Sequence, residues 1–85
     1  MSAWKAEIQV TLKKSVLDPQ GAAVEKALDV LGYKNVEKVR VGKYLELVLE
    51  AEKEDEAKSQ VEEMCERLLT NPVIEDYSCR IERIN

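Results

Sequence analysis

Apolar and polar side chains alternate without interruption over residues 4–12, with Trp4, Ile8 and Val10 in the apolar set and Lys5 in the polar one. Neighbouring side chains of a β-strand point to opposite faces of the sheet, so this period of two predicts a half-buried strand. Such a strand needs a second layer over its apolar face, while its other face can remain in water.

A helix is predicted after this strand, over residues 19–31. Asp18 can accept a hydrogen bond from the first turn as the N-cap residue, and Pro19 suits the first helical position. Gly32 stands where a left-handed residue would end the helix, because glycine adopts that conformation without steric cost. The apolar positions that recur at helical spacing are Val24, Ala27, Leu28 and Leu31.

The acidic run at residues 52–56 opens a second predicted helix, since negative charge favours the positive end of the helix macrodipole. Asn71 and Pro72 are expected to end it. An apolar stripe along this helix predicts that it packs on the sheet. The stripe consists of Ala57, Val61, Met64, Cys65 and Leu68.

Three further strands are predicted, over residues 36–41, 44–51 and 73–84. Gly42 and Lys43 separate the first two by a connection short enough for a hairpin. The resulting order is strand, helix, strand, strand, helix, strand. This order is typical of the ferredoxin-like βαββαβ plait, an α+β fold whose antiparallel four-stranded sheet carries two helices on one face.

A chain of 85 residues is too short for two separate apolar cores, so residues 1–85 are expected to form a single domain. A plait leaves one sheet face and its edge strands open. Such surfaces suit pairing with another copy or with another subunit. The predicted fold therefore favours an assembly module.

The charge balance argues against nucleic acid and membrane partners. Thirteen Lys and Arg residues against seventeen Asp and Glu residues give a net charge of -4, which repels phosphate backbones and anionic lipid heads. No apolar run approaches the roughly 18 to 20 residues of a membrane span, so a cytoplasmic location is expected. Cys65 and Cys79 are interpreted as reduced, buried thiols.

Catalytic chemistry has few candidates in this sequence. Histidine is absent, so neither cysteine can pair with a histidine base, and any acid or base would have to be a shifted Glu, Asp, Lys, Tyr or Cys. Gly21, Gly32 and Gly42 belong to three different turns and form no phosphate loop. The acidic run lacks the spacing and glycine of a calcium loop. We therefore assign no catalytic residue and no metal site.

Two turn segments carry more polar character than a bare plait needs, VLDPQG at residues 16–21 and VRVGKYLEL at residues 39–47. A helix cap and a hairpin turn would explain part of them. Basic residues in and near these segments suggest a local patch for a partner's carboxylates or a bound anion. These residues are Lys13, Lys14, Arg40 and Lys43.

Four segments together resemble the PurS family: TLKKSVLDPQG at residues 11–21, ALDVLGY at 27–33, VRVGKYLEL at 39–47 and NPVIEDY at 71–77. PurS is the small subunit of phosphoribosylformylglycinamidine synthase, the ligase of de novo purine biosynthesis that uses ATP and glutamine. The resemblance implies a non-catalytic chain that bridges the glutaminase subunit and the large synthetase subunit, so that ammonia from glutamine reaches formylglycinamide ribonucleotide.

The resemblance also implies that ATP and magnesium are used by the synthetase subunit, that this chain binds no cofactor, and that it forms a homodimer or a tetramer. Residues of two motifs would contact a partner. The first motif contributes Lys13, Asp18, Pro19, Gln20 and Gly21, and the second contributes Arg40, Gly42, Lys43 and Tyr44. The candidates for an interface between copies are Tyr44, Val48 and Tyr77.

Two other functions remain open at this point. A stand-alone plait of the ACT-like kind would bind a small regulatory ligand, and stabilisation by one amino acid in a thermal-shift panel would identify it. A small enzyme would turn over its substrate alone and would lose activity when Cys65 or Cys79 is changed.

Overall fold

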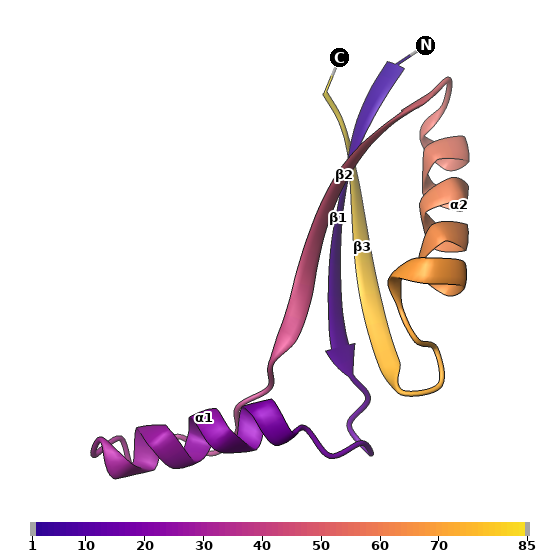
Figure 1. Ribbon diagram of the computed structural model, residues 1–85. Coiled ribbons are helices and arrows are strands. Elements are labelled where there is room, and N and C mark those ends of the chain that lie inside the picture. Colours follow the sequence, from indigo (N-terminus) through magenta and orange to yellow (C-terminus); the bar gives the residue numbers. More distant parts are fainter. Residues whose placement is uncertain (1, 85) are drawn as a thin grey trace.

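The computed structural model describes residues 2–84 and shows an α+β fold (Figure 1). The predicted domain range of 1–85 includes Met1 and Asn85, which lie outside the described residues. The elements in chain order are β1 (Ser2–Leu12), α1 (Pro19–Val30), β2 (Gly42–Ala51), α2 (Glu54–Met64), the π-helical turn η1 (Cys65–Leu69) and β3 (Glu75–Arg83).

The sheet is antiparallel and has three strands in the order β2-β1-β3. The alternating segment is the central strand β1, where Ile8 lies opposite Leu45 of β2 and Cys79 of β3. Trp4, Ala6, Ile8 and Val10 are buried, as the alternation predicts, and Leu12 at the end of the strand is half-buried. One face of the sheet is therefore a core face, and we call the other, polar one the open face.

Helix α2 covers the core face and contacts all three strands (Figure 1). Ile8, Val10, Val61 and Cys65 are fully buried between the sheet and this helix. At the far end of the core, the indole nitrogen of Trp4 donates a 3.0 Å hydrogen bond to the carbonyl oxygen of Ala51. These contacts fix α2 on the sheet.

The π-helical turn changes which leucine reaches the core. Both the backbone N–H and the hydroxyl of Thr70 donate to the carbonyl oxygen of Cys65, at 3.0 and 2.8 Å. The wider turn rotates the side chains that follow Cys65 relative to an α-helix. As a result Leu69 packs against the core, while Leu68, which the apolar stripe placed inside, is 82% exposed.

Helix α1 is the predicted first helix, and its ends are formed as expected. The Asp18 carboxylate accepts the backbone N–H of Gly21 at 2.9 Å, Pro19 occupies the first turn, and Gly32 has a φ of 103° just after the helix. Only its placement differs from the prediction, because α1 does not cover the sheet but projects from one end of it (Figure 1).

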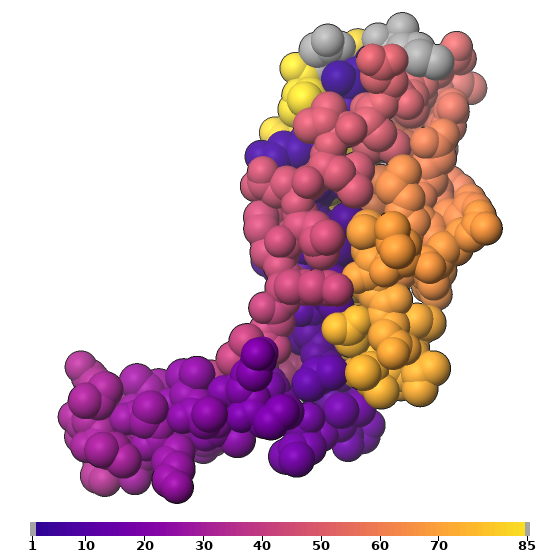
Figure 2. Space-filling model, in the orientation of Figure 1, coloured from indigo at the N-terminus to yellow at the C-terminus, as the bar shows by residue number. Residues whose placement is uncertain are grey.

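Residues 19–41, which comprise α1 and the extended segment that returns from it, form a projecting arm (Figures 1 and 2). The molecule measures 52 × 27 × 14 Å and its radius of gyration is 16.6 Å. A compact chain of this length would have a radius of gyration of about 12 Å. The arm therefore stands clear of the core that the rest of the chain forms.

The prediction of a strand over residues 36–41 is wrong for the described chain. Gly42 and Lys43 do not form a hairpin, because they are the first two residues of β2 and pair with Thr11 and Val10 of β1. In the predicted hairpin, residues 36–41 would pair with β2, but they run back along α1, where Val39 lies against Gly21, and the sheet of residues 2–84 ends at β2. Residues 2–84 thus contain three strands and one sheet-covering helix, instead of the four strands and two covering helices of the ferredoxin-like plait.

Candidate functional site

The carboxylate of Asp18 fastens the arm to the sheet. One oxygen accepts the N–H of Gly21 at the start of α1, and the other accepts the N–H of Val41 at the end of the return segment, each at 2.9 Å. These two hydrogen bonds, the Gly21 bond first, hold the pKa of Asp18 below its usual value of 3.8. The ionised carboxylate of Asp18 therefore connects the segment that enters the arm to the segment that leaves it.

Two glycines allow the backbone to approach closely at the same place. A Cβ atom added to Gly21 would collide with the carbonyl oxygen of Val39, and one added to Gly42 would collide with that of Val10. Gly21 is also the buried residue of α1. The base of the arm is consequently a tightly packed backbone junction, which we call the arm junction.

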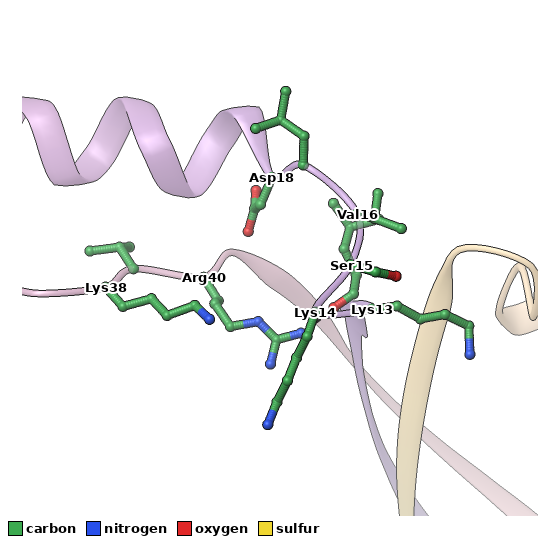
Figure 3. A pocket seen from close by; sticks show the side chains of 10 residues that line it. Lys13, Lys14, Ser15, Val16, Asp18, Lys38 and Arg40 are labelled. Carbon is green, nitrogen blue, oxygen red and sulfur yellow. Dashed lines mark hydrogen bonds between the residues drawn. The ribbon is translucent and has the colours of Figure 1, made fainter.

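Basic side chains surround this junction. Arg40 donates a hydrogen bond to the carbonyl oxygen of Leu12, and the Lys13 ammonium lies 3.0 Å from a carboxylate oxygen of Asp76 in β3. Lys14 and Lys38 are exposed. A hollow of about 390 Å³ lies between them, and its lining includes Lys14, Asp18, Lys38 and Arg40 (Figure 3).

A second hollow, of about 370 Å³, adjoins the first and includes Pro19, Gln20, Gly42 and Lys43 in its lining. The structure thus brings most of the residues that sequence singled out to the arm junction. These are Lys13, Asp18, Pro19, Gln20, Gly21, Arg40, Gly42 and Lys43. They come from positions up to thirty residues apart, and the return of the arm places them side by side.

Tyr44 and Val48 lie on the open face of the sheet, opposite Gln9 and Lys5 of β1. The Tyr44 hydroxyl donates to Glu7 at 2.7 Å and is also 3.0 Å from Glu46. These carboxylates, Glu7 above all, raise the pKa of Tyr44 and keep its proton on the phenol.

Lys5 lies 3.7 Å from Glu46, and Arg80 lies 4.0 Å from Glu7. The open face therefore carries a charged network around Tyr44, which sequence reasoning missed although the polar positions of the strands signalled such a face.

Tyr77 lies apart from both groups, on the core face opposite Val10. It is half-buried, its hydroxyl is 3.3 Å from a carboxylate oxygen of Glu66, and burial raises its pKa. Tyr77 is therefore placed to stabilise the packing of η1 on β3.

Exposed apolar residues of the arm were also missed as surface residues. Val30, Leu31 and Tyr33 are between 58% and 77% exposed. The helical spacing of residues 24–31 indicated an apolar face, and sequence reasoning assigned that face to the sheet of the same chain. The structure leaves it without a cover among the described residues.

The chemistry of these groups favours binding over bond making. The thiol of Cys65 is buried and that of Cys79 is half-buried, and desolvation raises both pKa values, so both thiols stay protonated and weakly nucleophilic. Over residues 2–84 no group of three His, Cys, Asp or Glu side chains is placed to hold a metal ion. In the same range, no helix is both long and apolar enough to cross a membrane.

Comparison with known proteins identifies the family. The PurS family model, described as phosphoribosylformylglycinamidine (FGAM) synthase, matches residues 5–83. This chain belongs to the PurS family. The PurS subunit of Bacillus subtilis is 49% identical over 81 residues, which are 95% of each chain, and that of Methanocaldococcus jannaschii is 44% identical over 95% of this chain and 98% of its own.

Solved structures of the PurS family share the fold. The crystal structure of Methanocaldococcus jannaschii PurS, one of the subunits of formylglycinamide ribonucleotide amidotransferase, superposes with a TM-score of 0.86 at 43% identity, covering 96% of this chain and 99% of that one. A chain of the PurLQS structure from Thermotoga maritima gives 0.89 at 38% identity, with coverages of 96% and 100%. The protein is accordingly a subunit of FGAM synthase, a ligase of purine biosynthesis.

Proposed function

We propose that this chain is the non-catalytic assembly subunit of FGAM synthase and acts as one PurS-like domain in the cytoplasm. It would hold the glutaminase subunit against the ATP-dependent synthetase subunit, so that ammonia released from glutamine reaches formylglycinamide ribonucleotide. The observation that carries this proposal is the arm, whose apolar side chains are exposed and therefore suited to contact with another polypeptide. The match over almost its whole length to a chain of the PurLQS structure supports it.

A second copy of this chain is the first partner that the arm fits. Residues 13–43 hold seven Lys and Arg and four Asp and Glu, a net charge of +3, whereas the remaining residues hold six and thirteen, a net charge of -7. The arm and its junction are thus basic and the body is acidic. A two-fold dimer in which each arm lies on the body of the other copy would bring the opposite net charges together twice and would cover Val30, Leu31 and Tyr33 of both arms.

The arm junction and the open face would contact the other subunits. The residues that we propose for these contacts, or for those between copies, are Lys13, Asp18, Pro19, Gln20, Gly21, Arg40, Gly42, Lys43, Tyr44, Val48 and Tyr77. Tyr77 would act indirectly, by fixing η1 and β3. ATP and magnesium would be used by the synthetase subunit, and this chain would bind neither.

The benefit of such a subunit is positional. Ammonia that leaves the glutaminase would be diluted in the solvent and would take up a proton. The resulting ammonium ion has no lone pair and is not a nucleophile. A rigid sheet with a fixed arm can hold the outlet of one active site against the inlet of the next, which replaces a diffusive encounter by a local transfer. The residues of this chain would orient the two partner subunits and exclude water between them, and they would move no proton themselves.

The proposal is tested by product formation with the synthetase and glutaminase subunits of the same organism, with and without this chain. We expect glutamine-dependent turnover to require the chain, and turnover with ammonium as nitrogen donor to proceed without it. If the chain changes neither rate, and the three proteins elute separately with nucleotide and glutamine present, the assembly role is wrong.

The ACT-like regulatory module is the alternative to this function. All relatives with a named function above are subunits of the synthase, and the hollows of the arm junction are open to solvent. A thermal shift of the isolated chain with a single amino acid, together with turnover rates that the chain does not change, would favour the alternative.

A further inference from the structure

The hollow beside the arm combines positive charge with an apolar wall. We call it the basic hollow and define it by Lys14, Lys38 and Arg40, with Leu17 and Val39 in its apolar wall. In Figure 3, Lys38 and Arg40 reach from the return segment toward the loop that carries Lys14. Three cations in one hollow are unexpected in a protein with a net charge of -4.

These cations have no carboxylate partner of their own within residues 2–84, where neither Lys14, Lys38 nor Arg40 forms an ion pair. The carboxylate in the wall is that of Asp18, and both of its oxygens already accept backbone N–H groups. The neighbouring Lys13 does not add to the hollow, because it points toward β3 and pairs with Asp76 (Figure 3). The hollow therefore keeps an unneutralised positive charge.

The apolar wall restricts what can fill the hollow. Leu17 is 80% exposed at its rim, and Leu12, Val16 and Val39 contribute further apolar surface. A ligand that only carries charge would leave these side chains in water. A segment that places an apolar side chain beside its carboxylates would satisfy both parts of the hollow, since apolar burial supplies affinity and charge pairing supplies orientation.

A free phosphate group fits less well. Phosphate sites at helix ends use spare backbone N–H groups. In the first turn of α1, Pro19 has no N–H, that of Gly21 is bound by the Asp18 carboxylate and that of Ala22 by the Asp18 carbonyl oxygen. The ionised Asp18 would also repel a phosphate, whereas a peptide can place its carboxylates at the lysines and its apolar side chain near Leu17.

We propose that the basic hollow binds an acidic segment of another FGAM synthase subunit, in which an apolar side chain lies beside two or more carboxylates. This inference rests on the proposed assembly function and names the chemistry of one of its contacts. Lys14 and Lys38 pair with the carboxylates, Arg40 lines the hollow while its hydrogen bond to Leu12 keeps the return segment in place, and Leu17 contacts the apolar side chain.

The test uses the double variant Lys14→Glu/Lys38→Glu in the three-subunit complex. Both lysines are exposed and neither makes an ion pair within residues 2–84, so we expect the variant to fold, and its thermal unfolding checks this. The matched control is Lys53→Glu/Lys58→Glu, which makes the same change of charge at the start of α2. The measurement is the dissociation constant of each chain from the assembled synthetase and glutaminase subunits, at low and at raised NaCl.

We expect the hollow variant to bind about tenfold more weakly or worse at low salt, because each reversal replaces an attraction by a repulsion, while the control stays within about twofold of wild type. Raised NaCl should weaken wild-type binding and narrow the difference. Leu17→Ala should also weaken binding, and this loss should persist at raised NaCl because it is not electrostatic.

Three results would overturn the inference alone. Equal binding of the hollow variant and wild type, with glutamine-dependent turnover intact, would show that the basic hollow does not bind another subunit and would leave the assembly function unaffected. A changed oligomeric state of the isolated hollow variant would assign the hollow to a second copy. Stabilisation of wild type, and not of the variant, by inorganic phosphate would make it a small-anion site. Failure of wild type itself to join the complex would overturn both this inference and the proposed function.

Discussion

Shortening Leu31 to alanine tests the proposed homodimer at the end of α1. Leu31 is 72% exposed, and its backbone N–H donates to Ala27 as part of the helix end. Alanine is a good helix former, so Leu31→Ala should leave the arm itself intact. Any effect on association then reports the side chain that the proposed second copy covers.

The expected size of the effect follows from the exposure of Leu31. The substitution removes three carbon atoms, worth about 2.4 kcal/mol if they pass from water to full burial. Since 72% of the residue is exposed in the single chain, the dimer gains about 1.7 kcal/mol from each copy. Two copies give about 3.5 kcal/mol, so the dissociation constant of the dimer should rise by about two to three orders of magnitude.

Sedimentation velocity over a dilution series measures this constant directly. The control is Leu68→Ala, which removes the same atoms from a leucine that is 82% exposed on η1, away from the arm. We expect the control to dissociate at the same concentration as wild type. A dissociation constant for Leu31→Ala within about threefold of wild type would refute the reasoning, because it would mean that the end of α1 stays in water in the dimer.

Three further predictions concern the core and the arm junction. Ile8→Ala leaves a cavity in the fully buried core and should lower the free energy of unfolding by about 2 to 5 kcal/mol, measured by urea titration. The lowered pKa of Asp18 means that its ionised form stabilises the folded chain above the unfolded-state pKa, and that this contribution is lost as pH falls through the folded-state pKa. The difference in stability between wild type and Asp18→Asn should therefore be greatest near neutral pH and shrink in acid, and a constant difference in urea titrations at each pH would contradict it. Gly21→Ala should push the return segment away from α1 and speed hydrogen exchange at the Val41 N–H, whereas unchanged exchange at Val41 would show that the junction tolerates a side chain.

Local signals in the sequence predicted the individual elements well. Asp18, Pro19 and Gly32 act through their own backbone and nearest neighbours, so the ends of α1 could be read from residue types alone. The alternation of residues 4–12 predicted the central strand for the same reason, since a strand with one buried face has a single possible register of apolar positions.

The tertiary arrangement could not be read in the same way. An apolar helix face such as that of α1 predicts that the face is buried in a contact. The spacing of the apolar residues does not say whether that contact is with the same chain or with another one. The prediction that Leu68 faces the core was wrong because one wider turn after Cys65 moves the apolar stripe by a residue. No residue type near Cys65 signals that turn.

The candidate site shows the same division. The polar turn segments pointed to the arm junction, and the structure brings most of their residues together there. Lys38 and Leu17 were missed because each is unremarkable in its own segment and becomes part of a hollow only when the arm returns. Tyr77 was named as a candidate for the interface between copies, and the structure turns its side chain toward the core of its own chain.

The order of strands in the sheet determines when each edge of β1 can pair while the protein is being synthesised. β1 is made first and lies in the middle, and its second neighbour is β3, with Trp4 opposite Arg83. Until residues 75–83 have left the ribosome, one edge of the most buried strand stays unpaired in the nascent chain. A pause in translation after α2 would therefore expose that edge to other nascent chains, and a chaperone that shields residues 4–12 would matter most in that interval.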